Sequence, residues 1–215
     1  MKHRRLNPAL ELQRYISEGE HTTQDFKFEI SDARKIAKTL SAFANTKGGR
    51  LLIGVKDNGN IAGVQSEEEK YMIEAAAHLY CRPEIHYTTK EIEVNNKTIL
   101  MVTIKESKQK PIFAIDEQDK PLAYIRIDDE TLLATTLHLQ LWRLDRKEKG
   151  EFMTYTEYEH SLLHYLKEKQ SLTLNQFYRK AKQSKRKTEF FLAKLIQFNV
   201  VELFFEDKKF RIKLK

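Results

Sequence analysis

The 215-residue chain is poor in cysteine, proline and glycine, with one, four and seven of them respectively. The single thiol, Cys81, cannot form an intramolecular disulfide, and it excludes a zinc site that is built on several thiolates. No stretch approaches the roughly 18 consecutive apolar residues that a transmembrane helix needs, and no apolar segment of a secretory signal follows the basic N-terminus. We therefore expect a cytoplasmic protein that has no membrane partner.

Several motifs of nucleotide binding and catalysis are also missing. The chain has neither a GxxxxGK[ST] phosphate loop nor a GxGxxG fingerprint, so a glycine-rich nucleotide site is excluded. It lacks the HExxH pair of a zinc hydrolase and the GxSxG elbow of a serine hydrolase. The function has to be sought in other features.

Positive charge is concentrated at the C-terminal end. Residues 1–145 contain 21 Lys and Arg against 22 Asp and Glu, whereas residues 146–215 contain 17 against 9. The net charge of +7 therefore comes from the C-terminal segment. Such asymmetry is typical of a segment that contacts a polyanion, and a surface that merely keeps the domain soluble is the alternative.

Hydrophobic periodicity predicts an α+β fold for residues 1–145. Apolar residues at helical spacing indicate helices at 8–18, from a cap at Ser31 or Asp32 to Asn45, at 67–80 and at 131–144. Alternating or short apolar runs indicate strands at 25–30, 51–55, 85–94, 98–104, 112–115 and 122–127.

A change of pattern near residue 146 predicts a second domain. Charge, a glycine and few apolar residues mark residues 146–153 as a linker. Three amphipathic helical segments follow, and then two alternating strands at 200–205 and 210–215. Three helices followed by a basic hairpin is the order of a small winged helix-turn-helix domain, which we expect in residues 154–215.

Five of the seven glycines lie within SAFANTKGGRLLIGVKDNGNIAGV, at positions 48, 49, 54, 59 and 63. Gly48 and Gly49 follow the expected helix end at Asn45, so we interpret them as a helix C-cap and a tight strand entry that require positive φ. The Asn58-Gly59 pair after the strand is a typical hairpin turn.

The segment AFANTKGGRLLIGVKDNGNIAGV, preceded by QDFKFE, resembles the Schlafen-type AlbA_2 module over residues 10–145. The resemblance lies in an acidic residue before Phe-Lys, the AFAN helix end, the glycine pair, the LLIGV strand and the DNGNIAG turn. It implies an AlbA_2-like mixed sheet with helices in residues 1–145, and it implies nucleic-acid binding. The family has also been labelled a divergent ATPase, which the missing Walker lysine does not support.

Some members that this segment resembles, the Schlafen ribonucleases, use three carboxylates to cut RNA. The matching positions here are Glu20, Asp25 and Asp57, which would hold Mg²⁺ or Mn²⁺ near a phosphodiester. Asp25 stands where the family has glutamate, and Asp57 adjoins a turn that an aspartate can stabilise through its own backbone. A catalytic role and a solvated or turn-stabilising role therefore both stay open.

Basic residues supply the candidate nucleic-acid contacts. Ser184 is a good N-cap, and it places three cations in the first turn of the third predicted helix of the C-terminal domain, where a helix-turn-helix meets DNA. The candidate contacts are Lys185, Arg186 and Lys187 on that helix, Lys208, Lys209 and Arg211 on the hairpin, and Lys27, Lys47 and Arg50 in the first domain.

A DNA-binding regulator of transcription is the leading interpretation. A metal-dependent endoribonuclease and a scaffold whose winged helix binds protein are the alternatives. The partner would be DNA or RNA. The only cofactor that we expect is Mg²⁺ or Mn²⁺, which the endoribonuclease would need. Because AlbA-like modules and winged helices often pair, we also expect a homodimer.

Overall fold

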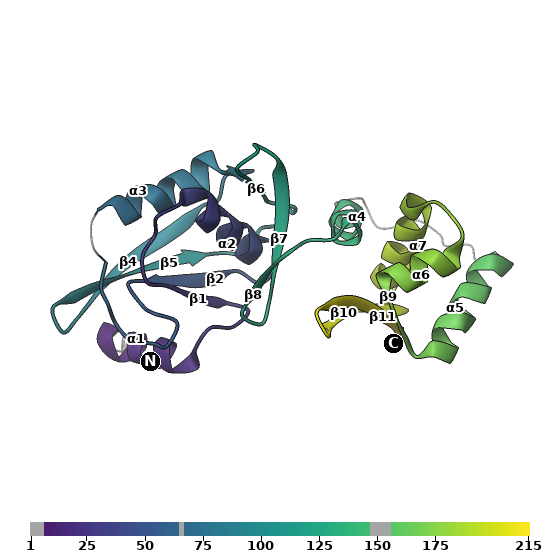
Figure 1. The fold of residues 1–215 in the computed structure, drawn as a ribbon, viewed down its shortest axis with the longest axis horizontal. Coiled ribbons are helices and arrows are strands. Elements are labelled where there is room, and N and C mark those ends of the chain that lie inside the picture. The colour runs from purple at the N-terminus through teal and green to yellow at the C-terminus, as the bar shows by residue number, and fades with distance from the viewer. Residues whose placement is uncertain (1–6, 65–66, 147–155) are drawn as a thin grey trace, which may run out of the picture. The chain divides into compact units, whose positions relative to one another are not determined.

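The computed structural model describes residues 7–64, 67–146 and 156–215 (Figure 1). The chain divides into two compact units, Met1–Ala134 and Thr135–Lys215. The domain boundary expected after Asp145 differs from this division, because helix α4 (Thr136–Asp145) packs with the second unit. The linker expected at 146–153 lies outside the described residues except for Arg146.

A four-stranded mixed sheet forms the centre of the first unit. Its order is β1-β2-β5-β4, with β1 and β2 parallel and the other pairs antiparallel. The β4–β5 hairpin turns at Asn95 and Asn96, as expected, and their φ angles of 50° and 59° suit a tight turn. The strands are β1 (Gln24–Lys27), β2 (Gly49–Ile53), β4 (Tyr87–Val94) and β5 (Lys97–Ile104).

A second, antiparallel sheet has the order β3-β6-β7-β8. The helix expected over 131–144 is wrong in its first part, because that part is strand β8 and α4 begins only at Thr136. Leu132 pairs with Ile125 of β7, and the Thr135 side chain then accepts the His138 N–H as the N-cap of α4. The strands are β3 (Cys81–Arg82), β6 (Phe113–Ile115), β7 (Pro121–Ile127) and β8 (Glu130–Leu133).

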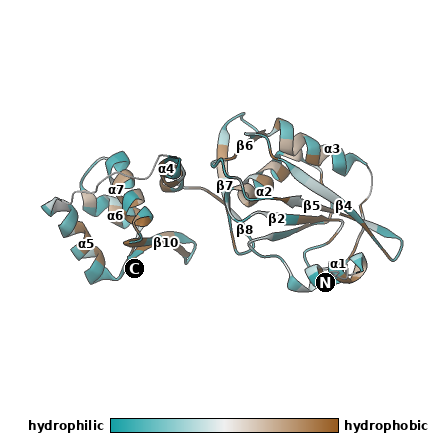
Figure 2. Ribbon diagram, turned by 180° about the vertical axis from the view of Figure 1, so that it is seen from behind, coloured by the Kyte–Doolittle hydropathy of each residue, from teal (hydrophilic) through white to brown (hydrophobic). Residues whose placement is uncertain are grey.

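Helices cover both faces of the first sheet. Helix α1 (Pro8–Glu18) buries Leu12 against Phe26 and Leu52 on one face. The other face packs on α2 (Ala33–Asn45), α3 (Glu68–Glu74) and the π-helical turn η1 (Ala75–Leu79). Hydrophobic colour along the central strand β2 marks this core in Figure 2. Burial of apolar surface on both faces supplies the main stabilisation of the unit.

Buried polar groups join α2 to the second sheet. The Ser41 hydroxyl donates to the Ile112 carbonyl at 2.8 Å, and the Asn45 amide donates to the carbonyls of Ile112 at 2.8 Å and Tyr124 at 2.9 Å. Asn45 also accepts the Ile112 N–H at 2.7 Å. The SAFAN segment thus satisfies the backbone where α2 meets β6 and β7.

The two adjacent glycines, Gly48 and Gly49, exclude a larger side chain for different structural reasons. Gly48 has φ +71°, as expected, and a Cβ there would lie 2.7 Å from the Ile104 carbonyl oxygen. The expectation of positive φ is wrong for Gly49, where a Cβ would instead lie 2.5 Å from the Phe43 ring. The glycine pair therefore serves close packing, which is a structural role.

The second unit contains four helices and a three-stranded antiparallel sheet among its described residues. The sheet has the order β10-β11-β9, and the short strand β9 was not expected from the sequence. Helix α4 contributes Leu137 and Leu144 to the core of this unit. After α4 the elements are α5 (Glu157–Lys169), β9 (Ser171–Thr173), α6 (Leu174–Ala181), α7 (Lys185–Gln197), β10 (Val201–Glu206) and β11 (Lys209–Leu214).

Candidate nucleic-acid interface

Asp25 is buried between two cations. It lies on β1 with 3% of its surface exposed, and its Oδ1 accepts a hydrogen bond from the Arg126 guanidinium at 2.9 Å. The Lys27 ammonium lies 2.7 Å from Oδ2. This second contact is an ion pair without hydrogen-bond geometry, so Oδ2 has no hydrogen-bond partner among the described residues. Both oxygens of Asp25 are thus next to positive charge.

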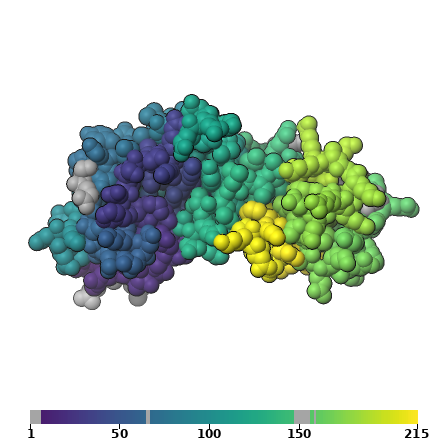
Figure 3. All heavy atoms as spheres, in the orientation of Figure 1, coloured from purple at the N-terminus to yellow at the C-terminus, as the bar shows by residue number. Residues whose placement is uncertain are grey.

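Sequence reasoning missed Arg126. It lies on β7, is 3% exposed, and also donates to the Thr131 hydroxyl at 3.0 Å and the Gln24 carbonyl at 3.3 Å. In the space-filling view the purple N-terminal residues lie against the teal residues of the first unit (Figure 3). The available signal was one arginine inside the apolar run LAYIRI. A fully buried arginine needs an acidic partner, and Asp25 is that partner.

Glu20 lies beside Asp25 and differs from it in environment. Its Oε1 accepts the Phe26 N–H at 2.8 Å. Burial raises the pKa of the Glu20 carboxyl above its ordinary value, and the neighbouring Asp25 raises it further, against the Phe26 hydrogen bond and the Lys27 charge. The protonated form of Glu20 is therefore favoured more than in a solvated glutamate.

Asp57 lies in an exposed turn that the Gly59 N–H closes by donating to the Lys56 carbonyl at 2.7 Å. The structure therefore brings Glu20 and Asp25 together and places Asp57 in the turn. In the described ranges no group of three or more His, Cys, Asp or Glu side chains could hold a metal ion. The three-carboxylate set does not fit Mg²⁺ or Mn²⁺, because Asp25 is already paired with Arg126 and Lys27.

The candidate cations of the first unit are largely engaged within the protein. Lys27 pairs with Asp25, and Arg50 donates to Gln24 at 2.5 Å and to Glu18 at 2.7 Å. The Arg50 guanidinium also stacks 3.6 Å from the centre of the Tyr15 ring. Lys47 is exposed in the turn after α2. Of these three candidates only Lys47 is thus both exposed and without a hydrogen bond or ion pair of its side chain to another described residue.

The candidate cations of the second unit are mostly exposed. Ser184 accepts the Lys187 N–H as N-cap of α7, which confirms the expected helix start, and Lys185, Arg186 and Lys187 are exposed. Lys208 and Lys209 are exposed at the β10–β11 turn. Arg211 differs, because it donates to the Ser171 hydroxyl at 2.7 Å and so joins β11 to β9.

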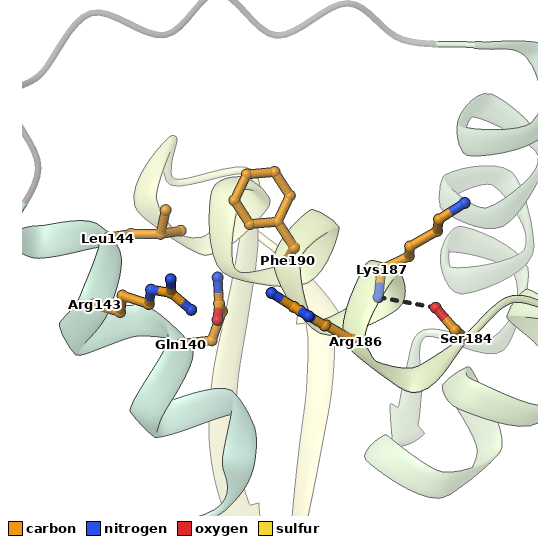
Figure 4. A pocket seen from close by; sticks show the side chains of 7 residues that line it. All are labelled: Gln140, Arg143, Leu144, Ser184, Arg186, Lys187 and Phe190. Carbon is orange, nitrogen blue, oxygen red and sulfur yellow. Dashed lines mark hydrogen bonds between the residues drawn. The ribbon is translucent and has the colours of Figure 1, made fainter.

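A pocket opens beside the first turns of α7 (Figure 4). Its volume is about 460 Å³, and helices α4 and α7 form its walls. The residues that line it are Gln140, Arg143, Leu144, Ser184, Arg186, Lys187 and Phe190. Two of the candidate cations, Arg186 and Lys187, therefore share a cavity with Arg143, which the sequence did not single out.

Comparison with protein families finds a match for most of the first unit. The model of the family described as "Schlafen, AlbA_2" matches residues 20–135, more than half of the chain. The chain belongs to the Schlafen AlbA_2 family. This confirms the resemblance that the glycine-rich segment indicated. None of the curated proteins compared with this AlbA_2 chain matches it.

Two solved structures are similar to this AlbA_2 protein at low identity. The DIP2311 protein from Corynebacterium diphtheriae is 16% identical with a TM-score of 0.47, over 77% of this chain and 34% of its own, so this chain spans about a third of that protein. The N-terminal domain of a protein from Nitrosomonas europaea, named as related to the ATP-dependent DNA helicase RecG, is 18% identical with a TM-score of 0.41. That match covers 70% of this chain and 97% of the domain.

Within the ranges that the structure describes, no helix has the length and apolar character needed to cross a membrane.

Proposed function

We propose that this AlbA_2 protein binds nucleic acid and acts as a DNA-binding regulator of transcription. The observation that carries the proposal is the exposed first turn of α7, in which three successive side chains are cationic: Lys185, Arg186 and Lys187. Helix N-termini and basic side chains are the usual contacts to DNA phosphates.

The topology of residues 156–215 supports a winged helix-turn-helix in the segment expected for it, 154–215. The order α5, β9, α6, α7, β10, β11 is that of three helices with a terminal hairpin, and β9 adds the third strand of the small sheet. In such a domain α7 is the recognition helix and the β10–β11 turn, with Lys208 and Lys209, is the wing. Both basic groups then belong to elements that contact DNA.

Helix electrostatics also favour an anionic partner. The N-terminal end of a helix carries partial positive charge, so cations in the first turn destabilise an isolated helix by a few tenths of a kcal/mol each. Helix α7 has no acidic residue in its first turn, and although Lys185 lies 3.7 Å from the Glu189 carboxylate one turn further on, no described carboxylate pairs with Arg186 or Lys187. A phosphate backbone against this turn would remove the unfavourable interaction.

The first unit supports the nucleic-acid role through its family, since the AlbA_2 resemblance implies nucleic-acid binding. We do not propose that the first unit is an endoribonuclease, because the Asp25 carboxylate already forms ion pairs with Arg126 and Lys27. A metal ion there would have to displace a buried ion pair.

The test uses the full chain, a labelled 20-base-pair duplex and a labelled structured RNA, each with Mn²⁺ and with chelator. We expect duplex binding that does not depend on the metal, and no cleavage of RNA. A triple substitution in α7 should abolish most of the binding, whereas three equal charge changes on exposed lysines of the first unit should not. The α7 set is Lys185→Gln, Arg186→Gln and Lys187→Gln, and the control set is Lys35→Gln, Lys105→Gln and Lys108→Gln.

Equal loss of binding in both triple variants would show that only total charge matters, and it would remove α7 from the proposal. Cleavage of RNA that requires Mn²⁺ would replace the regulator with the endoribonuclease. If neither nucleic acid binds, the remaining interpretation is the protein-binding scaffold.

A further inference from the structure

The pocket between α4 and α7 brings two arginines together from different helices. In Figure 4 the guanidinium groups of Arg143 on α4 and Arg186 on α7 point toward one another, with the Gln140 amide between them. Lys187 and Ser184 lie at the α7 end, and Leu144 and Phe190 form an apolar side. Cationic, amide and apolar groups thus surround one cavity.

The pocket carries positive charge that the described part of the protein does not neutralise. No carboxylate of the described residues lies within ion-pair distance of Arg143, Arg186 or Lys187. Arginines of the first unit do have acidic partners, since Arg50 pairs with Glu18 and Arg126 with Asp25. Two guanidinium groups that face one another repel, so an anion between them would be attracted by both.

A buried glutamate fixes the two walls of the pocket. Glu189 on α7 is 8% exposed and accepts a hydrogen bond from the Thr136 hydroxyl at the start of α4. It also accepts one from the Tyr178 hydroxyl of α6 at 3.3 Å. Together with the core contacts of Leu137 this holds α4 against α7, so the two helices that form the walls are in place before any ligand arrives.

We propose that this pocket binds the phosphate group of a nucleotide. Arg143 and Arg186 bind the phosphate oxygens from opposite sides, Gln140 donates a hydrogen bond, and Phe190 with Leu144 contacts the attached sugar or base. A guanidinium presents paired N–H groups that match the oxygens of a phosphate. The volume of about 460 Å³ lies in the range of small-ligand sites, roughly 300–1,000 Å³.

The phosphate has two sources: the backbone of a bound nucleic acid, or a free mononucleotide. The first source rests on the proposed function and extends its contact surface from α7 to Gln140 and Arg143. The second source does not rest on it. The experiment therefore has one arm for each source.

The variants are Arg143→Gln and, as matched control, Arg146→Gln. Both remove one exposed arginine from the C-terminal turn of α4, but only Arg143 lines the pocket. The first arm measures the affinity of the full chain for a labelled 20-base-pair duplex by fluorescence anisotropy. The second arm measures the melting temperature with added inorganic phosphate or 5′-dAMP, against sodium chloride of equal ionic strength. The exposure of Arg143 lets the variant fold, which the melting curve without ligand checks.

We expect Arg143→Gln to weaken duplex binding about tenfold, as for one lost charged hydrogen-bond pair, and Arg146→Gln to weaken it less than threefold. Equal duplex affinities, together with stabilisation by dAMP or phosphate that only Arg143→Gln loses, would assign the pocket to the free nucleotide. Equal behaviour of the two variants in both arms would overturn the proposal. A wild-type protein that fails to bind the duplex contradicts the proposed function, and the melting arm alone then decides on the pocket.

Discussion

At the scale of single residues, the role of the candidate carboxylate Asp25 depends on a partner that is distant in the sequence. The resemblance to the Schlafen ribonucleases singled out Asp25 as a candidate metal ligand, but it could not identify the partner of this side chain. Arg126 is 101 positions away, and only the tertiary fold brings its side chain on β7 to Asp25 on β1. Local spacing carries no information on such a contact, so the sequence alone left the metal site and the solvated role open. The structure indicates a third role, a buried ion pair.

Asp25→Asn should destabilise the protein by about 3–5 kcal/mol, because it leaves the buried Arg126 without an opposing charge. The free energy of unfolding in urea measures this. Asp57→Asn is the control and should change the free energy by less than about 0.5 kcal/mol, since its side chain is exposed. If Asp25→Asn unfolds like the wild type and only loses binding of Mn²⁺, Asp25 is a metal ligand and the ion pair has no structural importance.

At the scale of helices and strands, long periodic segments were predictable and short strands were not. The helix cap expected at Ser31 or Asp32 and the turn at Asn95-Asn96 follow from side-chain chemistry within a few residues; the structure has the cap at Asp32 and confirms the turn. The residues of β8 and β9 have no period long enough to identify them. Their strand conformation comes from pairing with β7 and β11, which tertiary structure supplies.

The glycine-rich segment gives a test of close packing. Gly48→Ala should destabilise the protein by at least about 2 kcal/mol, because positive φ costs a non-glycine residue about 1 kcal/mol and the Cβ would also meet backbone atoms. Gly59→Ala is the comparison, since Gly59 also has positive φ, +80°, but an added Cβ there would meet only the Ile16 side chain at 3.0 Å and no backbone atom. Thermal unfolding compares the two. Equal losses would mean that φ alone matters and that the Ile104 carbonyl can move away.

The start of α4 gives a test of pH dependence. Burial lowers the pKa of His138 to about 4, and the neutral ring accepts the Thr135 N–H on Nδ1. The stabilisation that neutral His138 provides is therefore complete above the ordinary pKa of 6.5 and is lost as the pH falls through 4.

His138→Gln keeps a side-chain acceptor at the same position of the capping box and removes the titration. Between pH 7 and pH 4 the wild type should lose up to about 3 kcal/mol more stability than His138→Gln. Urea unfolding at several pH values measures the difference. Parallel pH profiles would mean that His138 is solvated in the folded protein.

At the scale of the whole molecule, the sequence showed which part is basic but not how its cations group. The count of charges separated a neutral N-terminal part from a basic C-terminal part, and the N-cap at Ser184 placed three cations on α7. The sequence did not predict the pocket, because the domain boundary expected after Asp145 assigned Arg143 and Arg186 to different domains. Helix α4 joins the second unit through its buried leucines, and a sequence pattern does not reveal on which neighbour a helix packs.

This distribution of charge predicts how duplex binding responds to salt. Each phosphate that a cation neutralises releases a counterion, so the logarithm of affinity falls with the logarithm of salt concentration by about 0.9 per contact. The α7 triple variant should therefore show a slope that is shallower by about 2.7, the contribution of three contacts. The control triple in the first unit should keep the wild-type slope, because its lysines are outside the contact surface.

The slope separates local contact from general attraction, which a single affinity cannot do. Weaker binding of the α7 variant with an unchanged slope would mean that its three side chains position the helix without touching phosphate. Equal slope changes in both triple variants would mean that DNA spreads over the two units. Only a change confined to the α7 variant identifies the first turn of α7 as the place where counterions are released, because the two variants carry the same net charge.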